Sequence, residues 1–135
     1  MGELSKIRDA LKANLATIEG LRVSDIIPDS INPPMAIVGG PELIEYDTTM
    51  ARGADRLLIP VRVYAARTNE RTGQDKLDSY ITKSGSTSIK AAIESDTSLG
   101  GQAHTVRVQQ MRGYGSYTVG GADYIGAEWL VEVIS

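Results

Sequence analysis

Hydrophobic residues recur at two periods along the chain, and the change of period marks the expected elements. Near the N-terminus they fall at spacings of three and four, which line one face of an amphipathic helix. These residues are Leu4, Ile7, Leu11, Leu15 and Ile18. Gly20 then ends the helix, as a glycine after the last turn commonly does. The helical period returns between Thr68 and Asp96, where Gly85 separates two shorter helices and Ser86 or Ser88 can cap the second.

Strict alternation of apolar and other residues predicts the strands between the helices. Short strands are expected over 21–26 and 35–38, and residues 43–46 continue as an extended segment. The next strand runs from Arg56 to Ala66, and every second residue belongs to its core face. These core residues are Leu57, Ile59, Val61, Val63 and Ala65. Pro60 cannot donate a backbone hydrogen bond, which implies an edge, a bulge or a non-bonded position.

The last third of the chain reads as a hairpin. Alternation of apolar and polar residues resumes over 105–111, and Gly113 and Gly115 interrupt it before 117–119. Gly120-Gly121 suits a tight turn, because glycine tolerates positive φ. The clearest strand follows, from Ala122 to Ile134, with Trp129 on its core face. The element order predicts one α+β domain over residues 1–135, with helices packed on one face of a largely antiparallel or mixed sheet.

Composition narrows the classes of function. The 135 residues carry a net charge of -3, which argues against tight binding to nucleic acid. No cysteine is present, so disulfides, thiolate metal sites and thiol nucleophiles are excluded. Neither a signal peptide nor a run of about 18 apolar residues is found, so synthesis in the cytoplasm without membrane association is expected. An aliphatic core without phenylalanine is modest, which favours association with neighbouring subunits.

No constellation of catalytic, metal-binding or cofactor-binding residues stands out. His104 is the only histidine, and we interpret it as a polar residue that opens a strand. The acids Glu42, Glu45 and Asp47 are interpreted as a solvated face, since a paired-acid hydrolase needs two groups opposed across a cleft. We therefore expect no catalytic activity, no cofactor and no metal.

A second cluster has the composition of a base-stacking patch. It comprises Arg107, Arg112, Tyr114 and Tyr117. The acidic total favours a structural role for these residues over contact with nucleic acid.

Several sequence segments, taken in their order along the chain, resemble those of the tail terminator proteins of long-tailed bacteriophages (siphoviruses), particularly of phages that infect actinobacteria. They are the opening helix with Gly20-Leu21-Arg22-Val23-Ser24-Asp25, the Pro28 to Pro34 segment, the strand Leu57 to Ala65, Ser88-Ile89-Lys90-Ala91-Ala92-Ile93 with Leu99-Gly100-Gly101, and Glu128-Trp129-Leu130-Val131-Glu132-Val133. The resemblance spans nearly the whole chain and rests on length and element order rather than on a catalytic signature.

The resemblance implies a non-enzymatic virion protein at the head-proximal end of the tail. Such proteins form a hexameric ring on the last ring of tail tube protein, end tube polymerisation and present a joining surface to the head-tail connector proteins. DNA passes through the central pore without specific binding.

Candidate interface residues lie in two segments, of which the first is a polar loop too long for a tight hairpin. They are Thr48, Thr49, Met50, Arg52, Tyr114 and Tyr117. Another head-tail connector or tail-completion protein stays open as an alternative. A small cytosolic ligand-binding domain is a second alternative, and it would require a deep pocket with perturbed ionisable groups.

Overall fold

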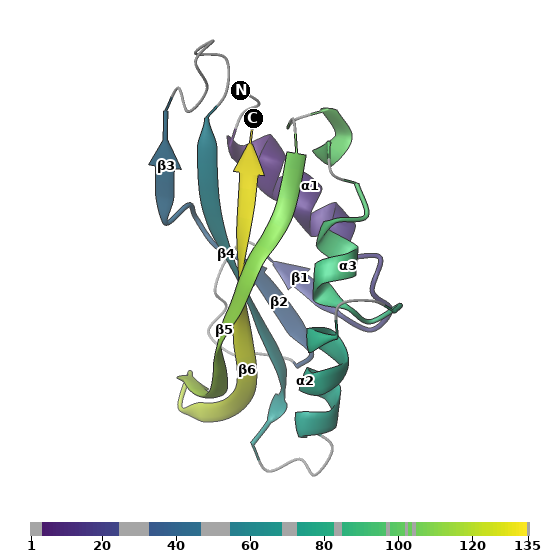
Figure 1. The fold of residues 1–135 in the computed structure, drawn as a ribbon. Helices are drawn as coiled ribbons and strands as arrows, with labels where there is room; N and C mark the ends of the chain where they lie inside the picture. The colour runs from purple at the N-terminus through teal and green to yellow at the C-terminus, as the bar shows by residue number, and fades with distance from the viewer. Residues whose placement is uncertain are drawn as a thin grey trace.

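Three helices lie on one face of a twisted six-stranded sheet in the part of the chain that the structure describes (Figure 1). The structure is a computed structural model and describes residues 4–24, 33–46, 55–68, 73–82, 85–96, 98–101, 103 and 105–134. The helices are α1 (Leu4–Leu15), α2 (Gly73–Ile81) and α3 (Ile89–Ile93), and η1 (Leu99–Gly101) is a short 3-10 turn. The strands are β1 (Arg22–Ser24), β2 (Met35–Val38), β3 (Leu43–Glu45), β4 (Arg56–Arg67), β5 (Thr105–Val119) and β6 (Ala122–Ile134). The α+β architecture with a mixed sheet and helices on one face is therefore confirmed.

The sheet is built around β4 and β6. Its order is β1-β2-β4-β6-β5, and β3 pairs with β4 beyond the end of β2. Only the β1–β2 pair is parallel among the described strands, and the remaining pairs are antiparallel. β5 and β3 consequently form the two lateral edges of the upper half of the sheet (Figure 1).

The core lies between the helices and the sheet. Alternate residues of β4 and β6 face it, including the expected set from Leu57 to Ala65, all of which are buried. Trp129 is 2% exposed and joins the same cluster, as its parity on β6 predicts. The helices contribute Ile7, Leu11, Leu15, Leu77, Tyr80, Ile89, Ala92 and Ile93, and Ile18 joins them from the turns that follow α1.

Side-chain hydrogen bonds complete the helix layer. The hydroxyl of Ser88 accepts from the backbone N–H of Ala91 at 3.1 Å, so Ser88 caps α3, as the sequence allowed. Asn14 lies on the buried face of α1, and its amide donates to the carbonyl of Ile93 at 3.0 Å. This bond satisfies an acceptor at the end of α3 and joins the two helices.

Pro60 occupies the third of its expected settings, a position that needs no donor. Its carbonyl accepts from the N–H of Gly39 at 2.9 Å, just past the end of β2. The N and C=O of one strand residue point to the same neighbour, so its nitrogen also points away from β6. The β4–β6 ladder therefore continues through Pro60 without loss.

Two boundaries differ from the expected ones. α1 ends at Leu15, and hydrogen-bonded turns carry the chain on to Gly20, so Ile18 is buried outside the helix. The hairpin strand β5 is continuous through Gly113 and Gly115, because register shifts absorb the irregular residues without ending the pairing with β6. Gly120 and Gly121 have φ values of 59° and 80° and form the expected turn.

Candidate assembly surface on the open face of the sheet

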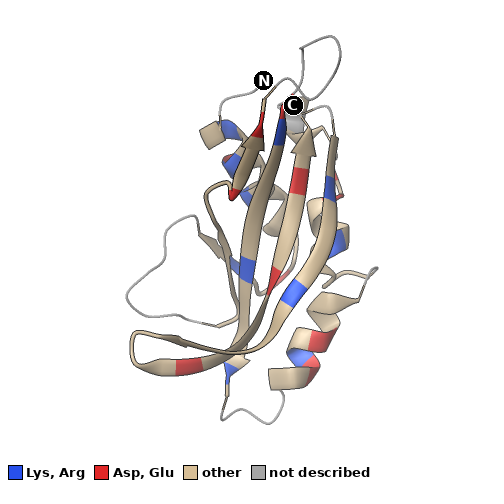
Figure 2. Ribbon diagram, turned by 60° about the vertical axis from the view of Figure 1, so that its left-hand side comes forward, with Lys and Arg blue, Asp and Glu red and all other residues tan. Residues whose placement is uncertain are grey.

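The face of the sheet turned away from the helices is the most distinctive surface of the described residues. Figure 2 shows the strands of this face, with the positions of basic residues in blue and of acidic residues in red along the ribbon. On β4 and β6 its charged residues come from alternate positions, because side chains of one parity share one face of a strand.

The first of two charged rows crosses all four strands in order. It consists of Glu45, Arg56, Glu132 and Arg107. Glu132 is central and accepts from Arg56 at 2.7 Å and from Arg107 at 3.1 Å. Glu45 approaches Arg56 from β3 at 3.5 Å. The hydrogen bond from Arg56 is the chief cause that holds the pKa of Glu132 below its usual value, and burial opposes it.

The second row crosses β6 four residues before the first, at Glu128 instead of Glu132. It consists of Glu42, Arg112, Glu128 and Arg62. Arg112 donates to Glu128 at 2.8 Å and also reaches Glu42, just before β3, at 2.7 Å. Both hydrogen bonds raise the pKa of Arg112, and the bond to Glu128 has the larger effect. Arg112 on β5 and Glu42 beside β3 therefore bond each other across the sheet within one chain.

Apolar residues fill the space beside the rows. Tyr64 and Tyr124 are 2% and 1% exposed, and their rings meet edge to face with centroids 5.9 Å apart. Ile37 completes this small second core, and Tyr117 packs against it from β5. The open face thus combines ion pairs between neighbouring strands with a small packed apolar cluster.

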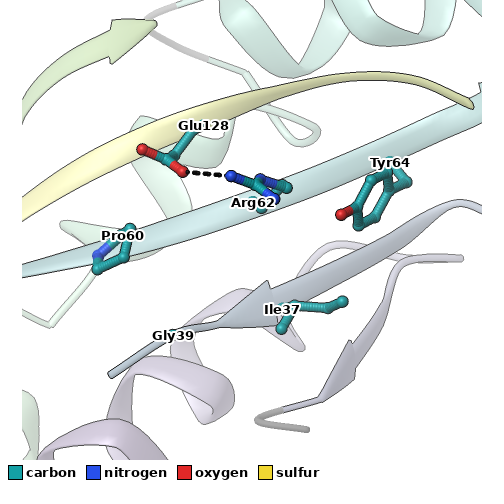
Figure 3. A pocket seen from close by; sticks show the side chains of 6 residues that line it. All are labelled: Ile37, Gly39, Pro60, Arg62, Tyr64 and Glu128. Carbon is teal, nitrogen blue, oxygen red and sulfur yellow. Dashed lines mark hydrogen bonds and ion pairs between the residues drawn. The ribbon is translucent and has the colours of Figure 1, made fainter. Parts of the chain in front are cut away.

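A shallow hollow opens beside Arg62. Figure 3 shows its lining, from the end of β2 to β4 and β6, with Glu128 bonded to Arg62 at 3.0 Å. Its volume is about 180 Å³, smaller than the ~300 Å³ at which ligand pockets begin. Two other hollows on the described surface hold about 230 and 250 Å³. The deep pocket that a ligand-binding domain requires is therefore not found among these three.

The predicted interface residues have separate outcomes. Thr48, Thr49, Met50 and Arg52 lie outside the described residues, as do Asp47 and His104. Tyr117 lies on the open face, where its ring sits 4.9 Å from the guanidinium of Arg62. Tyr114 is on the β5 edge instead and donates to Asp78 of α2 at 3.1 Å. The structure does not bring the two tyrosines together.

The expected basic and aromatic patch is also divided. Arg107 and Arg112 share the open face, but each is bonded to a glutamate of β6. Glu42 and Glu45, expected to be solvated, are about half exposed and engage Arg112 and Arg56. Charges held in such pairs leave little net positive potential for phosphate contacts.

The glutamates of β6 are the residues that sequence reasoning missed. Glu128 and Glu132 share one parity on the last strand, which placed them on the face opposite Trp129. The arginines that β4 contributes to the rows also share one parity, whereas Arg107 and Arg112 of β5 have opposite parity and reach the same face through the register shift between Val108 and Gln110. Charges of one parity on β4 and of the opposite sign on β6 are the part of this arrangement that the sequence shows, whereas the register that pairs them is not visible in it.

Comparison with known proteins gives no assignment. A scan against protein-family models and a search of curated proteins both return no match for this chain. Among the described residues there is no cluster of three or more His, Asp or Glu that could hold a metal ion. None of the described helices is long and apolar enough to span a membrane.

Proposed function

We propose that this chain is a non-enzymatic structural protein that forms a ring at the head-proximal end of a phage tail tube. In this role it ends tube polymerisation and joins the tube to the head connector, as its resemblance to tail terminators implies. The observation that carries the proposal is the open sheet face, which no described helix covers and which has a small apolar cluster beside its paired charges.

The electrostatics of this face support passage of DNA without adhesion. Four arginines contribute to it, and each forms an ion pair with Glu128 or Glu132. Arginines paired in this way release few counterions from DNA, so they contribute little to non-specific affinity. The net charge of -3 acts in the same direction.

Tail tubes of long-tailed phages test the proposal directly. The purified chain is mixed with polymerising tube protein, and tube lengths are measured by negative-stain electron microscopy. We expect shorter tubes that carry a ring at one end, with bovine serum albumin at equal concentration as the inert control. Tubes of unchanged length without end-bound rings, across tube proteins from several such phages, would overturn the proposal.

A further inference from the structure

The first charged row ends in opposite charges at the two lateral edges of the open face. Its acidic end is Glu45 on β3, and its basic end is Arg107 on β5 (Figure 2). Their side chains are 48% and 58% exposed, whereas Glu132 between them is 15% exposed. In the second row the residues at the two edges bond each other instead, because Arg112 of β5 reaches Glu42 beside β3 at 2.7 Å.

The acidic edge also exposes large apolar side chains. Leu43 of β3 is 43% exposed, and Tyr46 directly after the strand is 69% exposed. β3 has only three residues and pairs on one side with β4. Two exposed apolar side chains beside the half-exposed carboxylate of Glu45 suit contact with a basic surface of another chain.

The basic edge is closed to backbone pairing at one position but open to side-chain contacts. Glu94 of α3 accepts from the N–H of Val108 at 2.9 Å and is held by Lys90. A carboxylate in this place blocks strand addition along β5, as the register shifts further along it also do. Arg107, next to the blocked position, bonds Glu132 through its Nε and is 58% exposed, so its guanidinium can also reach a side chain of another copy.

We propose that a second copy of this chain docks edge to edge, with the β3 edge of one copy against the β5 edge of the next. Glu45 of one copy pairs with Arg107 of its neighbour, and Leu43 and Tyr46 become covered. The row Glu45-Arg56-Glu132-Arg107 of one copy then continues into the row of the next copy, and every pair of neighbouring copies makes the same contact. Such a head-to-tail contact builds a ring when its rotation closes. This inference rests on the proposed function and identifies the surfaces that join the subunits.

Charge exchange at the two edges tests the contact. Glu45→Lys makes both edges basic, and Arg107→Glu makes both edges acidic. Each variant alone should associate at least about tenfold more weakly than the wild type, because like charges then face each other. A one-to-one mixture should regain wild-type assembly, since each edge again meets its opposite. Sedimentation velocity over a concentration series at low salt measures both effects.

Two controls separate the contact from general effects. Glu19→Lys and Lys6→Glu make the same changes of net charge at exposed positions on the helix side, and they should assemble as the wild type does. Circular dichroism checks that all four variants are folded. Recovery on mixing is itself a control, because a folding defect in one chain is not repaired by another.

The outcomes distinguish this contact from the ring proposal. Wild-type rings with unaltered assembly of both edge variants would overturn the contact and leave the ring in place. So would weakened variants that stay weak on mixing. A wild-type chain that stays monomeric at every concentration would instead overturn the ring, and the contact with it.

Discussion

At the scale of single residues, a glycine of β6 lies directly against the backbone of β4. A Cβ built on Gly126 would lie 2.4 Å from the backbone oxygen of Val63 and 3.4 Å from the ring of Tyr117. Backbone atoms of a central strand cannot move aside without disturbing the ladder. Gly126 is thus required by its neighbours rather than by its own φ angle.

We expect Gly126→Ala to lower the free energy of unfolding by about 1–3 kcal/mol, the usual cost of overpacking. Gly115→Ala is the matched control, because Gly115 lies opposite on β5 and a Cβ there meets nothing within 4 Å. Urea denaturation compares the two. Equal stability of both variants would show that β4 and β6 do not approach as described.

Trp129 is the only tryptophan, so one residue reports on the core. Its ring is 2% exposed among the aliphatic residues of both layers. Trp129→Ala should lower the free energy of unfolding by about 3–5 kcal/mol through lost burial and a new cavity. In the wild type we expect blue-shifted fluorescence that moves to longer wavelength on unfolding. Solvent-like emission from the folded protein would contradict this placement.

At the scale of elements, the strands and helices were largely predictable, since each depends on its own periodicity. The buried faces of β4 and β6, the α3 cap at Ser88 and the Gly120-Gly121 turn are all local in the sequence. The charged rows were not predictable, because they depend on pairing between residues up to 76 positions apart. The same limit applies to Tyr124, which is buried on the face opposite the helices only because Tyr64 lies beside it.

The rows imply a defined pH dependence. The hydrogen bond from Arg56 lowers the pKa of Glu132, so folding favours the charged carboxylate. For Glu94, burial raises the pKa, but the hydrogen bonds from Lys90 and the Val108 N–H outweigh it. Both contributions are present above the unfolded pKa of about 4.3 and are lost as pH falls through the lower folded value.

We therefore expect the free energy of unfolding to decline steadily below about pH 5. Glu132→Gln should flatten this decline, because the variant has no carboxylate to protonate between Arg56 and Arg107. Glu19→Gln, at an exposed position after α1, serves as the control for loss of one acid. Thermal melts between pH 3 and pH 7 give the comparison. An unchanged slope in Glu132→Gln would count against the first row as a source of stability.

At the scale of the whole molecule, the two faces of the sheet differ in what covers them. Helices cover one face of the sheet, while the other face carries neutralised charges, a small apolar cluster and two edges of opposite charge. A chain with two unlike edges assembles head to tail, and the angle between copies decides between a ring and a filament. A terminator requires the closing angle, since an open one would continue the tube.

The pore of such a ring should be lined mainly by neutral or acidic side chains. Lysines and arginines around the pore would retain passing DNA through its phosphates. Retention of double-stranded DNA by the assembled protein at physiological salt checks this point. We expect no measurable retardation on a gel, and tight binding that weakens steeply with added salt would contradict the expectation.

Native mass spectrometry of the assembled protein, with electron microscopy of the same sample, tests the central claim most directly. Ring formation predicts one discrete closed species of six chains with an open centre, at concentrations where the edge contacts are saturated. A chain that remains monomeric at high concentration, and also when mixed with tail tubes, would contradict the account.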